Sequence, residues 1–260
     1  MEVKGKVALV TGSGSAGGIG RSTVLELAGM GAGGVVVNYA NPASQAKAEA
    51  VAAEAEALGA RALIQRADVS DDRQCRQMVE RTVEELGQLD ILVNNAATTI
   101  RVRFEDLEAL TDEVWDLNLN VNLKGPFYCI RAARPYLEAG SGGAVVNVSS
   151  IAGIRAVGSS SIAYAAAKAG VINMTMFLAR ALAPVIRVNC VTAGFVKGQW
   201  MEQSLGEDRY EKALERTASR IPMGRVAKPQ DVAQAICSLI SSDFITGQNL
   251  ICDGGFLIRD

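Results

Sequence analysis

The sequence of 260 residues contains no histidine. This absence excludes the Ser-His-Asp triad, zinc bound by histidine and imidazole general bases from the functions open to the chain. If the protein is a catalyst, its proton transfers must therefore use other side chains.

Cysteine is scarce and widely spaced. The five cysteines are Cys75, Cys129, Cys190, Cys237 and Cys252, and no two of them form a C-x-x-C pair. Their odd number and their spacing match neither a zinc site nor a disulfide framework. We expect reduced, mostly buried thiols, no metal site and a cytoplasmic protein.

An excess of charge of one sign is also missing. The chain has 26 Lys and Arg against 28 Asp and Glu, a net charge of −2, so no basic field is available to hold nucleic acid or an anionic membrane. The first residues lack the long apolar stretch of a signal peptide, and no run of about eighteen apolar residues occurs. We therefore expect a soluble protein that binds neither nucleic acid nor membranes.

Aromatic residues are few, at 5%, whereas 49% of the residues are hydrophobic. That content is ample for a core built mainly from Ala, Val, Ile and Leu. No internal repeat, low-complexity tract or linker divides the chain, so we expect a single domain over residues 1–260.

Short β-branched runs alternate with longer, alanine-rich stretches along the whole chain. This alternation indicates βαβ units and an α/β fold around a parallel sheet whose strands are buried on both faces. The expected strands are Val7–Thr11, Val35–Asn38, Ala62–Gln65, Ile91–Asn94, Ala144–Ser149, Arg187–Val191 and Asn249–Ile251. The expected helices lie near Arg21–Met30, Ala43–Leu58, Asp72–Leu86, Asp112–Leu137, Tyr164–Ala183 and Asp231–Ser241.

Glycine follows three of the expected helices, at Gly59, Gly87 and Gly140, where a left-handed C-cap is least costly for this residue. The segment Lys197–Gly224 is more polar and interrupts the pattern between the last two strands. We expect this segment to be helical in pieces and to act as a lid over the substrate.

A glycine-rich turn follows the first expected strand, and an amphipathic helix begins directly after it. Glycines let the backbone approach a pyrophosphate, and the first turn of a helix offers unpaired N–H groups. Two registers fit: Gly12-x-Gly14-x-x-Gly17 is the general dinucleotide fingerprint, and Gly14-x-x-x-Gly18-x-Gly20 is a longer variant of it. Between a strand and a helix, this turn predicts a dinucleotide-binding site.

The end of the second strand indicates which dinucleotide is bound. Proteins that prefer NAD place an acidic residue here, which hydrogen-bonds to the adenosine ribose, but residues 38–41 read Asn-Tyr-Ala-Asn. No carboxylate repels a 2′-phosphate, so we expect NADP in preference to NAD. An arginine to hold that phosphate is missing from the usual place, and Arg21 and Lys47 are the candidates to replace it.

The motif Tyr164-x-x-x-Lys168 opens the helix after the fifth strand, so the two side chains share one helix face. At about 4 Å and an effective dielectric constant near 20, an ammonium stabilises a phenolate by about 4 kcal/mol, or about 3 pK units. We therefore expect Lys168 to lower the pKa of Tyr164, which then serves as the general acid and base.

These motifs together make the chain similar to the classical short-chain dehydrogenase/reductase family over essentially its whole length. The resemblance is carried by the glycine turn, Asp68-Val69, Asn94 to Ala97, Val121 to Gly125, Ser149-Ser150, Tyr164-x-x-x-Lys168, Arg187 to Asn189, Thr246 to Gln248 and Asp253 to Gly255. It implies a single Rossmann-like, doubly wound domain with a seven-stranded parallel sheet, assembled as a homotetramer.

The resemblance also implies a catalytic tetrad of Asn122, Ser150, Tyr164 and Lys168. In these roles Ser150 hydrogen-bonds to the substrate carbonyl, Tyr164 delivers the proton, and Lys168 lowers the pKa of that tyrosine and holds the nicotinamide ribose. Asn122 positions a water that relays protons. Ser149 is the alternative to Ser150, but the Ser-x-x-Gly spacing of the family favours the second serine.

Further residues are expected to hold the cofactor. Asp68 resembles the family's adenine contact, Ala96 lies behind the cofactor, and Asn94 stabilises the central sheet instead. The full set of expected cofactor contacts is Gly12, Gly14, Gly18, Ile19, Gly20, Asn38, Tyr39, Asp68, Val69, Asn95, Ala96, Tyr164, Lys168, Gly194 and Val196.

Some positions depart from the family pattern. The glycine loop is two residues longer than Thr-Gly-x-x-x-Gly-x-Gly, Ala193 precedes Gly194 where proline is usual, and Gly198 stands where a threonine often contacts the nicotinamide. None of these departures removes a catalytic group.

The sequence thus predicts an NAD(P)H-dependent oxidoreductase that interconverts a ketone and a secondary alcohol by hydride transfer. The second strand and the C-terminal third resemble 3-oxoacyl-carrier-protein reductases, so a 3-oxoacyl thioester is the leading substrate class. A sugar, polyol or steroid dehydrogenase is the alternative within the same chemistry. A nucleotide-binding regulator without turnover is the alternative outside it. Thr98–Phe104 and Gly198–Gly224 are expected to line the substrate pocket.

Overall fold

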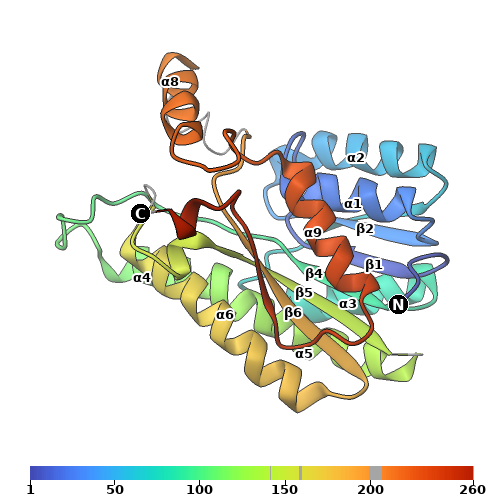
Figure 1. Ribbon diagram of the computed structural model, residues 1–260. Coiled ribbons are helices and arrows are strands. Elements are labelled where there is room, and N and C mark those ends of the chain that lie inside the picture. Colours follow the sequence, from blue (N-terminus) through green and yellow to red (C-terminus); the bar gives the residue numbers. More distant parts are fainter. Residues whose placement is uncertain (141, 158–159, 199–206, 260) are drawn as a thin grey trace.

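The computed structural model describes residues 1–140, 142–157, 160–198 and 207–259. Its centre is one parallel sheet of seven strands in the order β3-β2-β1-β4-β5-β6-β7 (Figure 1). The strands are β1 (Val7–Val10), β2 (Gly34–Tyr39), β3 (Arg61–Arg66), β4 (Ile91–Asn94), β5 (Gly143–Ser150), β6 (Ile186–Ala193) and β7 (Asn249–Cys252). The strand order reverses between β1 and β4, which is the switch point of a doubly wound fold. The predicted fold class is confirmed.

Helices cover both faces of the sheet (Figure 1). One face carries α1 (Ile19–Gly29), α2 (Gln45–Ala57) and α9 (Pro229–Ser241), and the other carries α3 (Asp72–Leu86), α5 (Gly125–Ala139) and α6 (Ile162–Leu182). Along β2, Val35 and Val37 belong to the first core and Val36 belongs to the second. Because successive side chains of a strand point to opposite faces, two buried faces require the continuous apolar runs seen in the sequence.

The predicted helix over Asp112–Leu137 is present but is not regular. Helix α4 (Asp112–Leu119) passes into a π-helical turn at Asn120–Lys124, where the Gly125 N–H donates to the carbonyl of Asn120. The proline at position 126 explains the change, because it has no N–H to give to the carbonyl of Asn122 four residues earlier.

The left-handed glycine caps are confirmed at two of the three predicted positions. Gly59 and Gly87 have φ of 94° and 87°. At Gly140 the prediction is wrong, since this residue is extended with φ −89° and ψ −157°. The left-handed residue is Gly142, where a Cβ atom would lie 3.0 Å from the Val185 carbonyl oxygen.

The segment predicted as a lid is helical in its second half. Helix α8 (Glu207–Ala218) stands apart from the sheet and the two helical layers (Figure 1). Before it, Val196 bridges to Ala227, which joins the two ends of the segment beside the sheet. Residues 199–206 of the predicted lid lie outside the described part of the chain, and the lid function stays a prediction.

Within the described residues, one helix, α6, is long and apolar enough to cross a membrane by length and composition. The same helix packs against β5 and β6, with Ala163, Ala167 and Val171 fully buried. Core helices pass this test as readily as membrane spans do. Burial within the fold accounts for part of the apolar composition of α6, since 39% of the apolar window is buried.

A chain of buried polar side chains joins β4 and β5 to α6. Asn94 Nδ2 donates to Asn147 Oδ1 over 2.9 Å, and Asn147 Nδ2 donates to Thr175 Oγ1 over 2.9 Å. Thr175 in turn donates to the carbonyl of Val171 on its own helix. Because buried polar groups are costly unless paired, this chain holds α6 in one position against the sheet. It agrees with the structural role expected for Asn94.

Candidate active site

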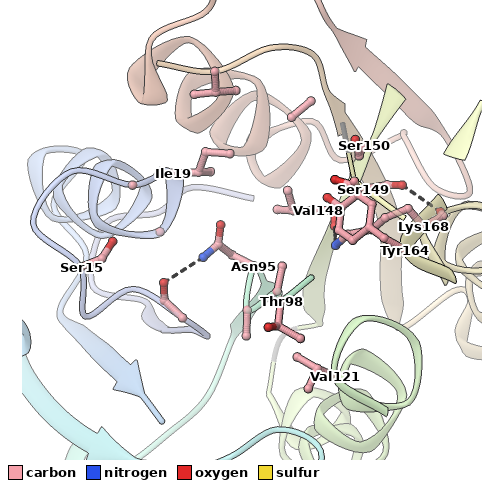
Figure 2. A pocket seen from close by; sticks show the side chains of 18 of the residues that line it. Ser15, Ile19, Asn95, Thr98, Val121, Val148, Ser149, Ser150, Tyr164 and Lys168 are labelled. Carbon is pink, nitrogen blue, oxygen red and sulfur yellow. Dashed lines mark hydrogen bonds between the residues drawn. The ribbon is translucent and has the colours of Figure 1, made fainter. Parts of the chain in front are cut away.

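The carboxyl ends of the strands open into one cavity of about 650 Å³. Its walls are the turn after β1, the ends of β2, β4, β5 and β6, and the first turns of α6 (Figure 2). A cavity of this size suits a small-molecule ligand, and its position at the switch point is where doubly wound folds bind ligands.

The cavity brings together most of the residues predicted for the site. Its lining includes Gly12, Gly14, Gly18, Ile19, Gly20, Asn38, Tyr39, Val69, Asn95, Ala96, Ser150, Tyr164, Lys168, Gly194 and Val196. Asn122 and Asp68 are not part of the lining. Ser15 and Ser44 line the cavity but were not predicted. The sequence contains features that could have indicated both residues. Ser15 lies within the lengthened glycine loop, and Ser44 lies directly before a helix.

Packing around the glycine turn decides between its two registers. A Cβ atom would lie 2.7 Å from Ala96 Cα at Gly12 and 2.9 Å from Tyr39 Cβ at Gly14. At Gly18 and Gly20 it would lie 2.8 Å from Ser15 Oγ and 2.6 Å from Asn95 Nδ2. Gly17 has no such neighbour within 4 Å. The longer register, which uses Gly14, Gly18 and Gly20, is therefore the one that packing requires.

The first turn of α1 can hold an anion. Its N-cap is Gly18, which has no side chain to bond to the free N–H groups, and no acidic residue lies in the first turn. The unpaired N–H groups and the positive end of the helix dipole therefore face the turn. The arrangement fits the pyrophosphate of a dinucleotide.

Two asparagines hold the glycine turn against the sheet. Asn38 Oδ1 accepts from the Gly12 N–H over 2.9 Å, and its Nδ2 donates to the carbonyls of Gln65 and Ala67. Asn95 Nδ2 donates to the Gly12 carbonyl over 3.1 Å (Figure 2). Asn38 was predicted to contact the cofactor, but its buried amide is already paired with main-chain groups. Its place in the structure is that of a residue that positions the loop.

The two adjacent serines at the end of β5 have different partners. Ser149 Oγ donates to the Lys168 carbonyl over 2.9 Å and is buried. Ser150 shares a side-chain hydrogen bond with Tyr164, which acts to lower the pKa of that tyrosine. Ser149 is thus tied to the backbone of α6, whereas Ser150 faces the tyrosine (Figure 2). The geometry favours Ser150 as the catalytic serine.

Asn122 acts on the site through a neighbouring loop. Its Nδ2 donates to the carbonyls of Thr98 and Asn118 over 2.8 and 3.0 Å, and its Oδ1 accepts from the Thr98 N–H over 3.2 Å. The π-helical turn places this fully buried amide beside the strand end that leads into Thr98. The side chain of Asn122 therefore holds the cavity wall, and its amide is not available to a water molecule.

Asp68 lies between the cavity residues Ala67 and Val69 but faces outward. Its Oδ1 accepts from both the main-chain N–H and the hydroxyl of Ser70. The N-cap of α3 is Asp71 rather than Asp68. The adenine contact expected for Asp68 stays a prediction.

Tyr164 and Lys168 lie on one face of α6, as predicted. Ser161 caps this helix by accepting from the Tyr164 N–H over 3.1 Å. Lys168 Nζ donates to the Val148 carbonyl over 3.0 Å and lies 5.7 Å from the centre of the Tyr164 ring. Both side chains are buried.

Burial sets the proton affinities of this pair. It raises the pKa of Tyr164 to about 12, although the hydrogen bond with Ser150 acts to lower it. It lowers the pKa of Lys168 to about 8, because the ammonium loses its hydration. The expectation that Lys168 brings the pKa of Tyr164 toward neutrality is not met, because desolvation of the phenolate is the largest influence and raises that pKa.

The lowered pKa of Lys168 predicts how stability depends on pH. Between pH 8 and 10.5 the unfolded chain holds a proton on this lysine that the folded chain has lost, so its contribution to the free energy of unfolding rises with pH. In Lys168→Met this contribution is absent. We expect the stability of the variant relative to wild type to fall by about 3 kcal/mol across that window, measured by urea unfolding. A stability difference between the variant and the wild type that does not change with pH would contradict the lowered pKa of Lys168.

Sequence comparison places the chain among known enzymes. Residues 12–257 match the family model described as enoyl-(acyl carrier protein) reductase. The 3-oxoacyl-(acyl-carrier-protein) reductase FabG of Thermotoga maritima is 41% identical over 261 residues, which cover 99% of this chain and 100% of the relative.

Solved structures agree with the sequence comparison. A protein described as a short-chain dehydrogenase/reductase, from Burkholderia xenovorans, has a TM-score of 0.88 at 34% identity, covering 97% of this chain and 98% of that one. A blue fluorescent protein from a metagenomic library, solved in complex with NADPH, has a TM-score of 0.87 at 32% identity, covering 98% and 99%. Because sequence, fold and site geometry agree along nearly the entire chain, it belongs to the short-chain dehydrogenase/reductase family.

Proposed function

We propose that the protein is an NADPH-dependent reductase that converts a ketone into a secondary alcohol, with a 3-oxoacyl thioester as its substrate class. The observation that carries this proposal is the cluster of Ser150 with the buried Tyr164 and Lys168, which lines the same cavity as the glycine turn. The similar Thermotoga protein is a 3-oxoacyl-(acyl-carrier-protein) reductase, and the similar metagenomic protein binds NADPH, which supports both parts of the proposal.

We place the cofactor along the cavity, from the end of β2 to the first turns of α6. The glycine turn and the first turn of α1 would hold the pyrophosphate, residues at the end of β2 would hold the adenosine, and Lys168 would hold the nicotinamide ribose. NADPH bound in this way supplies the hydride. The side chains of the protein then have to orient the ketone and supply one proton.

Ser150 and Tyr164 meet these two requirements. Their hydroxyls are close enough to hydrogen-bond to each other, so a carbonyl oxygen that replaces this bond can accept from both. A pKa of about 12 keeps Tyr164 protonated at neutral pH, ready to act as the acid in the reductive direction. Tyr164 gives its proton to the carbonyl oxygen as the adjacent carbon is reduced, and the ammonium of Lys168 stabilises the phenolate until a solvent proton replaces it.

The proton must reach Tyr164 from solvent, and Asn122 has one group suited to that path. Its side-chain amide is bonded to Thr98 and Asn118, whereas the residue that would pair with its main-chain carbonyl in a regular helix, Pro126, has no N–H to donate. We assign the water that was expected beside Asn122 to this carbonyl. The side chain of Asn122 then serves as a positioning group.

Reduction of simple 3-oxoacyl compounds tests the function. We expect loss of NADPH absorbance with acetoacetyl-CoA and with ethyl acetoacetate. Ser150→Ala should lower kcat by at least about a hundredfold, because one donor to the developing oxyanion is lost. Ser149→Ala is the matched control, which should cost about 1 kcal/mol of stability and far less activity.

Other outcomes of the same assay would change the proposal. A wild-type protein that binds NADPH but reduces no ketone would overturn it in favour of a nucleotide-binding regulator without turnover. The protein could instead act on sugars, polyols or steroids and not on 3-oxoacyl compounds. That result would keep the proposed hydride transfer but reject the 3-oxoacyl thioester as the substrate class.

Several features of the adenosine end support NADPH over NADH. No carboxylate lies at residues 38–41, and α2 has no acidic residue in its first turn. Arg21, one candidate to hold the 2′-phosphate, forms an ion pair with Glu54 and is not available for it. Lys47 stays as the candidate because it is exposed in the first turn of α2.

Cofactor preference can be tested at Ala40. Tyr39 is the last residue of β2 and its side chain is buried, whereas Ala40, the next residue, is exposed; both residues line the cavity. Ala40→Asp should shift the ratio of kcat/KM values toward NADH by at least about tenfold, through repulsion of the 2′-phosphate and a bond to the ribose. Ala40→Asn, with the same shape and no charge, should shift it much less. A wild-type enzyme that prefers NADH would contradict our interpretation of this loop.

The proposal includes assembly as a homotetramer in the cytoplasm. Large apolar side chains are exposed on α5 and α6, among them Phe127 and Phe177, and in the C-terminal part of the chain, among them Phe244, Leu250 and Ile258. Exposed apolar side chains in two parts of the chain suit two different two-fold interfaces, which together build a tetramer. The five free cysteines, four of them buried, suit a reducing compartment.

Light scattering tests the assembly. We expect a tetramer mass at micromolar concentration, and a dimer for Phe177→Arg, because a charge on an apolar interface leaves only the second interface intact. A monomeric wild type would refute the tetramer.

A further inference from the structure

Arg101 differs from the other arginines of this protein. Of the arginines whose side chains the structure describes, only Arg21, Arg101 and Arg187 are half-buried, and the rest are exposed. Arg21 is paired with Glu54, and Arg187 donates to two main-chain carbonyls at the end of α9 and to that of Ile245 after the helix. Within the described residues, Arg101 has neither an ion pair nor a hydrogen bond from its side chain. Because Arg101 is half-buried it has lost part of its hydration, which an anionic ligand in the cavity that it lines can replace.

The position of Arg101 is on the substrate side of the cavity. It lines the cavity together with Thr98, Leu117 and Tyr164. The next residue, Val102, is buried against Ala163, which directly precedes Tyr164 in α6. In Figure 2, Thr98 and Tyr164 lie across the cavity from Ser15 of the glycine turn. Arg101 therefore belongs to the half of the cavity that holds the ketone, away from the pyrophosphate.

The charges around this half of the cavity are unbalanced. Arg101 and Lys168 are the only charged residues among the described lining, and no Asp or Glu faces it. Lys168 is held by the Val148 carbonyl and belongs to the catalytic cluster. The nearest acidic residues along the chain are engaged elsewhere, Glu105 with Arg103 and Asp106 with the Ala109 N–H. Burial lowers the pKa of Arg101, and no carboxylate opposes that effect.

We propose that Arg101 binds an anionic group of the substrate, a carboxylate or a phosphate, and so selects ketones that carry one. This inference rests on the proposed function, because it names a substrate feature for the same cavity. A planar guanidinium binds either oxyanion with two parallel hydrogen bonds, which strengthen in a cavity that excludes water. The carboxylate would belong to the acyl chain, and the phosphate would belong to the arm that carries the thioester.

Two matched pairs of substrates test the proposal and separate these sources. The first pair is ethyl acetoacetate, which is neutral, and monoethyl 3-oxoglutarate, which carries a carboxylate. The second pair is the acetoacetyl thioester of N-acetylcysteamine, which is neutral, and acetoacetyl-CoA, which carries phosphates. For Arg101→Gln we expect kcat/KM to fall by about tenfold to a hundredfold for the anionic member of one pair and by less than about twofold for its neutral member. A selective loss in the first pair assigns a carboxylate, and one in the second pair assigns a phosphate.

Two further variants serve as controls. Arg103 lies two residues away, is 87% exposed and pairs with Glu105. Arg103→Gln should therefore leave kcat/KM unchanged for all four substrates. Arg101→Lys keeps the charge without the fork of two donors and should recover part of the lost activity. Equal loss for the neutral and anionic members of both pairs would overturn the proposal. A weakened Kd for NADPH that accounts for the whole loss would also overturn it.

A binding measurement keeps this test separate from the test of the function. Coenzyme A and monoethyl glutarate can be titrated calorimetrically into the wild-type protein and into Arg101→Gln, each saturated with NADP⁺. Binding of either anion to the wild type and a loss of at least about tenfold in the variant would support the role of Arg101 even if no ketone is reduced. Equal binding by both proteins would refute it, whatever the activity.

Discussion

The site depends on how the main-chain groups at the carboxyl edge of the parallel sheet find hydrogen-bond partners. At this edge the strands separate into loops, and their N–H and C=O groups leave the ladder while staying buried. Side chains at the strand ends replace the missing partners: Asn38 accepts from the Gly12 N–H, and Asn95 donates to the carbonyls of Thr11 and Gly12. The glycine turn is therefore held in place by side chains of the protein itself.

The same requirement accounts for the irregular helix between α4 and α5. A regular helix would need a donor at position 126 for the carbonyl of Asn122, and proline has none. The helix widens into a π turn at that place, and Asn122 uses its side chain to bind both the N–H and the carbonyl of Thr98. The irregular turn thus positions the side chain that holds Thr98 in the wall of the cavity.

Burial, more than pairwise attraction, sets the chemistry of the cavity. It raises the pKa of Tyr164 and lowers that of Lys168, so the tyrosine is an acid in the resting protein and the lysine holds its proton weakly. A negatively charged ligand would offset part of the desolvation cost of every cation nearby and so raise the pKa of that cation. That consideration applies to both cations that line the cavity, Lys168 and Arg101.

The sequence by itself determined the features that depend on near neighbours in the chain. Hydrophobic runs indicate all seven strands, glycine spacing indicates the dinucleotide turn, and a separation of four residues places Tyr164 and Lys168 on one helix face. Only the tertiary structure decided what depends on residues far apart. It turns the amide of Asn38 toward the glycine loop, ties Ser149 to the backbone of α6, and reverses the expected shift in the pKa of Tyr164. Pairing and desolvation arise when distant segments exclude water together, and no local pattern contains that information.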